Sequence, residues 1–306
     1  MIKSEHLSKH YGALTAVDDV TFQVAPGEVL GFLGPNGAGK TTTMRMLAGF
    51  VAPSSGKASI CGHDIERDAL AAKAALGYLP EGAPAYGEMT VRGFLEYIAD
   101  RRELAARRAA RLDYVIGRLQ LESVLEQSVE TLSKGFRRRV GLAQAMMHDP
   151  PVMILDEPTD GLDPNQKHEV RTLINEMSRD KIIVISTHIL EEVDAVCNRV
   201  IIVARGRIVA DDTPQGLAAK SRYHNAVSMR LERPEQLAAT RAAIAALPSV
   251  AEVVVSAREA RLTALPRAGA PVLAALSELA ARQGLALKEL HLESGRLDEV
   301  FRTITA

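Results

Sequence analysis

The sequence predicts an α/β fold with a mostly parallel core sheet, followed by a small α+β domain of ferredoxin-like topology. Over the first two thirds of the chain, short runs rich in β-branched residues alternate with longer helical patterns, which is typical of a parallel sheet covered by helices. The runs are apolar throughout, as strands buried on both faces are. Near residue 220 the sequence pattern changes to one that predicts alternating strands and alanine-rich helices. We therefore expect one domain over residues 1–219 and a second over residues 220–306.

The elements follow in order along the chain. Buried strands are expected at residues 28–34, 151–156, 181–186 and 199–204. A charged helical pattern at residues 89–126 predicts a helical lobe, which we place at about residues 82–148. After residue 220 the pattern is strand, helix, strand, strand, helix, strand, with a last helix at residues 295–305. This β-α-β-β-α-β order is the split βαβ, or ferredoxin-like, arrangement.

Composition narrows the class of partner and the compartment. The 306 residues include 37 Lys and Arg and 38 Asp and Glu, so no net field attracts nucleic acid, and we expect no nucleic-acid partner. Cys61 and Cys197 lie far apart and suggest no disulfide framework, which fits a reducing cytoplasm. The N-terminal residues lack the apolar stretch of a signal peptide, and the longest apolar runs are too short to span a bilayer. We expect this chain by itself to be soluble.

A glycine-rich motif follows the first buried strand. GPNGAGKTT, residues 34–42, matches G-x-x-x-x-G-K-[ST] between a strand and a helical pattern. Its glycines let backbone N–H groups face phosphate oxygens, while Lys40 adds positive charge and Thr41 is placed to hold Mg²⁺. The predicted nucleotide-binding residues are Gly34, Pro35, Asn36, Gly37, Ala38, Gly39, Lys40, Thr41 and Thr42.

Two further strand ends carry chemistry. VMILDEP places Asp156 and Glu157 where a parallel sheet presents ligands, so Asp156 can reach Mg²⁺ through water while Glu157 faces the attacking water. KIIVISTH ends on His188, which can donate to a γ-phosphate or orient the water and Glu157. Without the glycine-rich motif, a solvated acidic turn would explain Asp156 and Glu157 equally well, and a lone histidine would usually be structural.

TLSKGFRRR, residues 131–139, places a hydroxyl, a lysine, a glycine and three arginines at an expected helix start. A hydroxyl and backbone N–H groups at a helix start are suited to gripping an anion. Consecutive helical residues point about 100° apart, so Arg137, Arg138 and Arg139 cannot form one patch. We expect these arginines to be solvated or to face a partner.

The motifs together resemble the ATP-binding subunit of an ABC transporter. The glycine-rich loop, LSKGF, ILDEP, GLD at residues 161–163 and a strand ending in TH follow the family order over about residues 1–215. The resemblance implies that Tyr11 stacks on adenine and that Asp163 is an inter-subunit aspartate. It also implies that Ser133, Lys134 and Gly135 meet an ATP held by another copy. Lys134 replaces the family's usual glycine, and it either adds charge near phosphate or points into water.

A second departure lies in GYLPEGAP, residues 77–84, where the family usually has a glutamine and this chain has Glu81. A carboxylate is a stronger ligand for a hard cation than an amide oxygen. We expect Glu81 to contact the metal or its water and to couple the site to the membrane partner, with a solvated loop carboxylate as the alternative. Glutamate here, together with LSKGF, is similar to the ATPases of ABC-2 type exporters, including gliding-motility and multidrug types.

The resemblance implies a transport function. Two copies, as a homodimer or pseudo-dimer, would enclose two ATP with Mg²⁺, and hydrolysis would power a separate ABC-2 type transmembrane subunit docked near residues 82–98. The expected location is cytoplasmic, peripheral on the inner face of the membrane. The alternative is a non-transport ABC ATPase that acts as a nucleotide-driven regulatory switch. For the C-terminal domain, which has no recognisable polar constellation, we expect a dimerising or regulatory role, with His224 and His291 structural.

Overall fold

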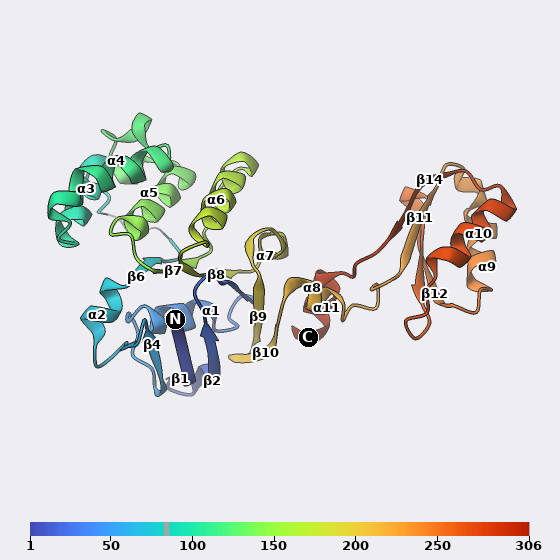
Figure 1. Ribbon diagram of the computed structural model, residues 1–306, viewed down its shortest axis with the longest axis horizontal. Coiled ribbons are helices and arrows are strands. Elements are labelled where there is room, and N and C mark those ends of the chain that lie inside the picture. Colours follow the sequence, from blue (N-terminus) through green and yellow to red (C-terminus); the bar gives the residue numbers. More distant parts are fainter. Residues whose placement is uncertain (83–85, 306) are drawn as a thin grey trace. The chain divides into compact units, whose positions relative to one another are not determined.

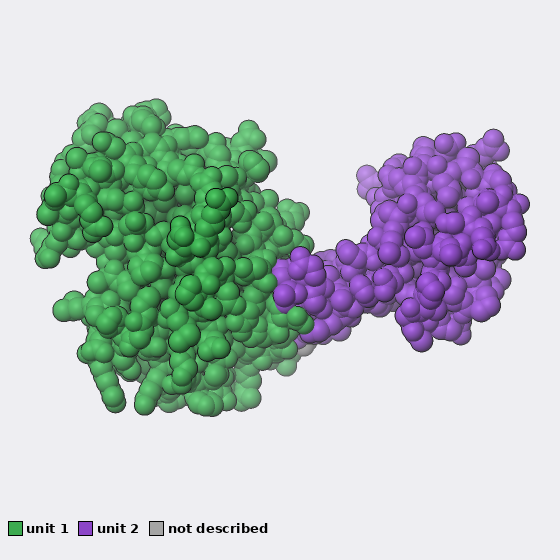
Figure 2. Space-filling model, viewed as in Figure 1, with its two compact units in different colours: residues 1–212, 305 green, residues 213–304, 306 purple. Residues whose placement is uncertain are grey.

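The computed structural model describes residues 1–82 and 86–305 and divides into two compact units (Figures 1 and 2). The first comprises residues 1–212 with Thr305, and the second comprises residues 213–304. The division therefore falls after Asp212, ahead of the boundary expected at residue 219.

A six-stranded sheet forms the centre of the first unit. The predicted buried strands are present as β3 (Val29–Leu33), β7 (Val152–Asp156), β8 (Ile182–Thr187) and β9 (Arg199–Ala204). With β6 (Leu76–Leu79) and β10 (Arg207–Asp212) they take the order β10-β9-β3-β8-β7-β6, parallel except for β10. Every residue of β3, β7 and β8 is buried, which explains their unbroken apolar sequences.

The first unit also contains a second, antiparallel sheet, which was not predicted. Its strands are β1 (Ile2–Tyr11), β2 (Leu14–Val24), β4 (Ser55–Ile60) and β5 (His63–Asp64), in the order β2-β1-β4-β5. Helix α1 (Lys40–Leu47) shares one apolar core with both sheets through Met44, Met46 and Leu47. The helix that follows the glycine-rich loop is thereby fixed from two sides.

The remaining helices of this unit include the predicted lobe. It holds α3 (Val91–Arg101), α4 (Arg108–Arg118) and α5 (Lys134–Met146), which lie together in Figure 1. Residues 83–85 of its expected span lie outside the described residues. The other helices are α2 (Ala69–Ala74), α6 (Pro164–Met177) and α7 (Leu190–Val196). Each helix in the described part of the chain is too short or too polar for a transmembrane span.

The second unit has the predicted ferredoxin-like order. After α8 (Pro214–Ala218) come β11 (Val227–Leu231), α9 (Leu237–Ala245), β12 (Val250–Ser256), β13 (Arg261–Pro266), α10 (Leu273–Gln283), β14 (Leu287–Leu292) and α11 (Leu297–Thr305). The strands form one antiparallel sheet in the order β12-β13-β11-β14. Its core joins residues of the strands to residues of α9 and α10, among them Met229, Leu262, Ile244 and Leu276.

Candidate active site

Three parallel strands bring the predicted site residues to one edge of the central sheet. β8 lies between β3 and β7, and the register pairs Leu33 with Thr187 and Asp156 with Ser186. The three strands therefore end level with one another. The glycine-rich loop, the Asp156–Glu157 turn and His188 all follow these ends, as the sequence predicts.

The glycines of the loop are required by space and by backbone angle. Gly37 and Gly39 have φ values of 79° and 104°, in the left-handed region that favours glycine. A Cβ on Gly39 would lie 2.4 Å from the carbonyl oxygen of Ala16, and one on Gly34 would lie 2.5 Å from that of Val203. These close approaches hold the loop against neighbouring backbone and start helix α1 at Lys40.

Lys40 is buried at the base of this loop. Its side chain is 6% exposed, and Nζ donates to the carbonyl oxygens of Gly34 at 2.7 Å and Pro35 at 3.1 Å. Burial lowers the pKa of Lys40, while the carboxylates of Glu157 and Asp156 oppose that shift. The ammonium group is thus held at the loop by backbone oxygens that an incoming phosphate can replace.

Asp156 is fully buried at the end of β7. Among the described residues neither of its carboxylate oxygens accepts a hydrogen bond. Burial raises its pKa, and the nearby hydroxyls of Ser186 and Thr41 pull the pKa the other way. Two buried and unpartnered carboxylate oxygens beside the Thr41 hydroxyl are a fitting donor set for a hard divalent cation. The described residues hold no group of three or more His, Cys, Asp or Glu that could bind a metal alone, so such a cation would also need ligand oxygens.

Glu157 and His188 meet directly. His188 Nδ1 lies 2.8 Å from Glu157 Oε1, and the Glu157 N–H donates to Ser186 O at 2.8 Å. The histidine side chain is half exposed, whereas that of Glu157 is 11% exposed. One carboxylate oxygen of Glu157 is therefore held beside the ring of His188, and part of that histidine stays open to solvent. The two side chains that the sequence predicts to act together are thus in contact, and their catalytic roles stay predictions.

A buried carboxylate behind this pair was missed in the sequence. Glu192 of α7 is 2% exposed and accepts hydrogen bonds from the hydroxyls of Thr159 and Thr187, the latter at 2.8 Å. Burial raises the pKa of Glu192, and the Thr187 hydrogen bond opposes this. The signal was available: Glu192 lies on the helix face that it shares with the buried Val193 and Val196. A charged residue on an apolar face indicates a specific partner.

The stretch TLSKGFRRR, residues 131–139, begins a helix as predicted. Ser133 is the N-cap of α5, and its Oγ accepts from the Phe136 N–H at 3.3 Å. Gly135 is buried, and a Cβ there would lie 2.7 Å from Gln166 Oε1. Lys134 is exposed, and its Nζ pairs with Asp160 Oδ2 at 2.7 Å. A role of Lys134 near the phosphate of another copy stays a prediction.

The expectation for the arginine run was wrong for two of its three members. Only Arg137 is exposed, whereas Arg138 is 5% and Arg139 is 7% exposed. Arg139 donates to Glu169 Oε2 at 2.8 Å, and Arg138 donates to backbone carbonyls at the end of β7. The error has a physical cause: α5 is a buried helix, and two consecutive positions can both fall on its wide apolar face.

The residues named from resemblance occupy different settings. Tyr11 ends β1 with its ring 49% exposed and Lys9 Nζ 5.2 Å from the ring centroid, so a face for stacking is accessible. Asp163 caps α6, where Oδ1 accepts from the Gln166 N–H at 2.9 Å. Glu81 is exposed beside Pro80, close enough for its charge to act on Lys40. The roles of these three residues stay predictions.

Comparison with known proteins decides the family. The family model described as ABC transporter matches residues 17–160. The Nod factor export ATP-binding protein I of Paraburkholderia xenovorans is 40% identical over 220 residues, which is 71% of this chain and 72% of that protein. The daunorubicin resistance ATP-binding protein DrrA3 of Streptomyces coeruleorubidus is 35% identical over 302 residues, 97% of this chain and 93% of that protein. The chain belongs to the ABC transporter ATP-binding proteins. The similarity to DrrA3 includes the second unit of this ABC ATPase.

Solved structures agree with this assignment. A structure titled as the ATP binding subunit of an ABC transporter has a TM-score of 0.67 and 32% identity, covering 72% of this chain and 92% of that one. The dimeric structure of MJ0796, a bacterial ABC transporter cassette, matches at a TM-score of 0.65 and 22% identity, over 70% and 99% of the two chains. It shows the same fold. The ABC ATPase described here is an ATP-binding and ATP-hydrolysing subunit of an ABC exporter, and the alternative of a non-transport regulatory switch is set aside.

Proposed function

We propose that two copies of this ABC ATPase enclose two ATP with Mg²⁺ and use hydrolysis to power an ABC-2 type membrane exporter. The observation that carries the catalytic part is the convergence at one sheet edge. There, buried Lys40 and the unpartnered Asp156 carboxylate lie beside the Glu157–His188 pair. A site with a phosphate cradle, a metal-binding carboxylate and an oriented base is equipped to hydrolyse as well as to bind.

The chain's own groups divide the work on the nucleotide. The backbone N–H groups of residues 36–42 and the Lys40 ammonium group hold the phosphates, and Thr41 with Asp156 would hold Mg²⁺. Bound there, Mg²⁺ neutralises charge on the phosphate oxygens. The exposed ring of Tyr11 stacks on the adenine. Glu81 would reach the metal or its water from the loop at the end of β6.

Glu157 acts as the general base. Its Oε1 is occupied by His188, whereas Oε2 lies 3.4 Å from the Thr187 hydroxyl, which donates to Glu192 at 2.8 Å instead, so Oε2 retains its lone pairs for water. The water oxygen bonds to the γ-phosphorus, its proton moves to Glu157, and the bond to the ADP oxygen breaks. Nε2 of His188, the ring nitrogen that does not contact Glu157, orients the γ-phosphate when it carries a proton.

A second copy completes the site. The phosphate loop covers one side of the triphosphate, and the developing charge on the other side needs further donors. Ser133 is exposed at the start of α5, where a helix N-terminus offers N–H groups to an anion. We place this end of α5, with Asp163 nearby at the start of α6, over the ATP of the partner copy. ATP then joins the two copies, and its hydrolysis lets them separate.

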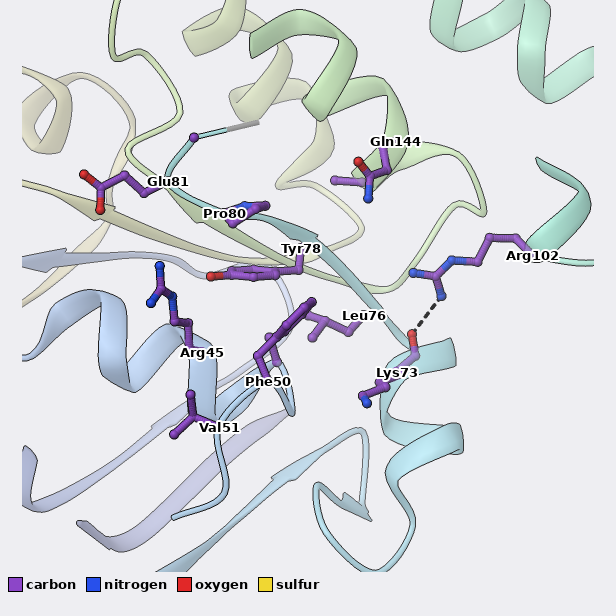
Figure 3. A pocket seen from close by; sticks show the side chains of 13 residues that line it. Arg45, Phe50, Val51, Lys73, Leu76, Tyr78, Pro80, Glu81, Arg102 and Gln144 are labelled. Atoms are coloured by element: carbon purple, nitrogen blue, oxygen red, sulfur yellow. Dashed lines mark hydrogen bonds between the residues drawn. The ribbon is translucent and has the colours of Figure 1, made fainter. Parts of the chain in front are cut away.

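A groove in the first unit is the proposed docking place of the membrane subunit (Figure 3). Its cavity volume is about 560 Å³, and Phe50, 71% exposed, packs on Tyr78 at 5.3 Å between ring centroids. Arg45, Lys73 and Arg102 surround it, and Glu81 lies at its edge. An apolar ring among three cations fits a short segment that carries an apolar side chain and a carboxylate. Of residues 82–98, where docking was expected, Gly82 lines this groove, and residues 83–85 lie outside the described part.

The names of two relatives support export as the direction of transport. One similar protein is named for Nod factor export and another for daunorubicin resistance. We place this chain on the cytoplasmic face of the membrane, held there by its transmembrane partner. The second unit, shared with DrrA3, supplies a dimerising or regulatory function.

The test begins with the purified chain and Mg-ATP. Glu157→Gln should lower phosphate release by at least about 100-fold while ATP binding persists, and ATP should then shift the protein to a dimer in size-exclusion chromatography. A variant that stays monomeric at saturating Mg-ATP would contradict the two-copy site. For docking, Arg45→Glu and Phe50→Asp should each reduce co-purification with the membrane protein encoded beside this chain. Equal recovery of all three proteins would rule out the groove.

A further inference from the structure

Arg138 joins the helical lobe to the catalytic turn by its side chain. It lies in α5, five residues after Ser133, and is 5% exposed. Its Nη2 donates to the carbonyl oxygens of both Asp156 and Glu157. Its Nη1 donates to the carbonyl oxygen of Pro80 at 2.8 Å. One guanidinium thus holds the backbone that carries Asp156 and Glu157 and also the loop that carries Glu81.

The backbone at this turn is one that needs such a partner. Glu157 has a φ of 51°, in the left-handed region that costs a residue with a Cβ about 1 kcal/mol or more. The Asp156 and Glu157 carbonyls are close enough together for one nitrogen to bond both. Glu157 O also accepts from the Asp160 N–H at 3.1 Å, which continues the turn. A cation at this point stabilises the conformation that aims the Glu157 side chain at His188.

The placement is specific to Arg138 among the three arginines. Arg137 is exposed, and Arg139 bonds Glu169 and Gln120, both outside the catalytic turn. Burial lowers the pKa of Arg138, and Asp156 is the largest opposing charge. Because an arginine retains its proton even so, the group is a permanent buried cation beside the carboxylates.

We propose that Arg138 is a positioning residue that sets the geometry of the Asp156–Glu157 turn and links it to the docking groove through Pro80. Pro80 and Glu81 both line that groove. A movement of the loop of Pro80 and Glu81 would displace the Arg138 guanidinium, which also bonds the Glu157 carbonyl. Occupation of the groove is thereby coupled to the orientation of the Glu157 side chain. The link to a docked partner rests on the proposed function, whereas the positioning of Glu157 does not.

The chain offers a matched set of variants for the first part. Arg138→Gln removes the cation that bonds the turn and should lower kcat by about 10- to 100-fold, with KM for ATP within about two-fold because Lys40 is untouched. Arg139→Gln also removes a buried guanidinium from α5 and should lower the Tm similarly, yet leave kcat within about two-fold. Arg138→Lys, whose ammonium can bond two carbonyls but not reach a third, should recover most of kcat. Equal kcat for Arg138→Gln and Arg139→Gln would overturn the proposal.

The absence of tryptophan from this chain provides a readout for the second part. Phe50→Trp places a single fluorophore in the groove, and Mg-ATP should change its emission. Adding Arg138→Gln or Arg138→Lys should reduce that change by more than half at saturating ATP, since both lose the Pro80 bond. A full response in these double variants, or no response in Phe50→Trp alone, would overturn the link. Neither measurement uses the membrane partner, so failure of docking in co-purification is seen separately.

Discussion

Glu192 should set the strength of the general base without touching ATP. Its carboxylate accepts the Thr187 proton at 2.8 Å, while the same hydroxyl lies 3.4 Å from Glu157 Oε2. The Thr187 hydroxyl has one proton, so it donates to the nearer carboxylate, that of Glu192. In the described part of the chain, the hydroxyls of Thr159 and Thr187 contact Glu192. Of these two, only the Thr187 hydroxyl lies near a second carboxylate, that of Glu157. In Glu192→Gln the amide oxygen still accepts the hydrogen bond from the Thr159 hydroxyl. The Thr187 hydroxyl then donates to Glu157 instead.

The magnitude follows from that one transferred hydrogen bond. A hydrogen bond to a charged group is worth about 1.5 to 3 kcal/mol, and here it stabilises the ionised base before it accepts a proton. Part of this is lost in the transition state, which gives a decrease in kcat of about 10-fold. KM for ATP should be unchanged because the phosphate loop is not involved. Steady-state phosphate release over a range of ATP concentrations measures both quantities.

Two further variants decide whether this reasoning holds. Thr187→Val with Glu192→Gln removes the hydroxyl that turns, so the double variant should be faster than Glu192→Gln alone. Glu191→Gln, on the exposed neighbour, should behave as the wild type. A Glu192→Gln variant with kcat within two-fold of the wild type would refute the argument. So would a double variant slower than Glu192→Gln.

Three other predictions test the site. Burial raises the pKa of Asp156, so the folded chain loses stability as pH rises from about 4 through the raised pKa, by about 1.4 kcal/mol for each pH unit between the unfolded and folded pKa values. Without nucleotide, the Tm of Asp156→Asn minus that of the wild type should therefore increase as the pH rises from about 4 to about 7. A difference that decreases over this range contradicts the prediction. Gly34→Ala puts a Cβ 2.5 Å from Val203 O and should cost about 1 to 3 kcal/mol by thermal unfolding, more than Gly117→Ala in α4, where the added Cβ would meet Glu122 Oε1 at an ordinary 3.8 Å. Tyr11→Ala should raise KM for ATP by about 5- to 100-fold at unchanged kcat, while Tyr11→Phe retains the wild-type KM; equal KM values in all three would exclude stacking.

Local motifs made the edge of the sheet predictable. GPNGAGKTT, ILDEP and STH each follow a buried strand, and parallel strands end at the same edge, so their meeting follows from topology alone. The antiparallel sheet could not be predicted in the same way. Buried and exposed residues do not alternate regularly in β1, and the neighbours Leu7 and Ser8 are both buried. The cause is that the pairing with β2 shifts register between Ser4 and Leu7 and again before Lys9. Such bulges hide the period of two on which strand prediction depends.

The arginine run was misjudged because only the angle between neighbours was considered. From Arg138 to Met146 every residue of α5 except Gln144 is buried, so this part of the helix is enclosed on nearly all sides. Two of the three arginines therefore lie in the enclosed part of α5, where a charge must have specific partners. Side chains of that length reach past the helix, one to Glu169 and one to the catalytic turn. A charge on a buried helix thus indicates a polar partner within reach, and for Arg138 that partner is the backbone holding Glu157.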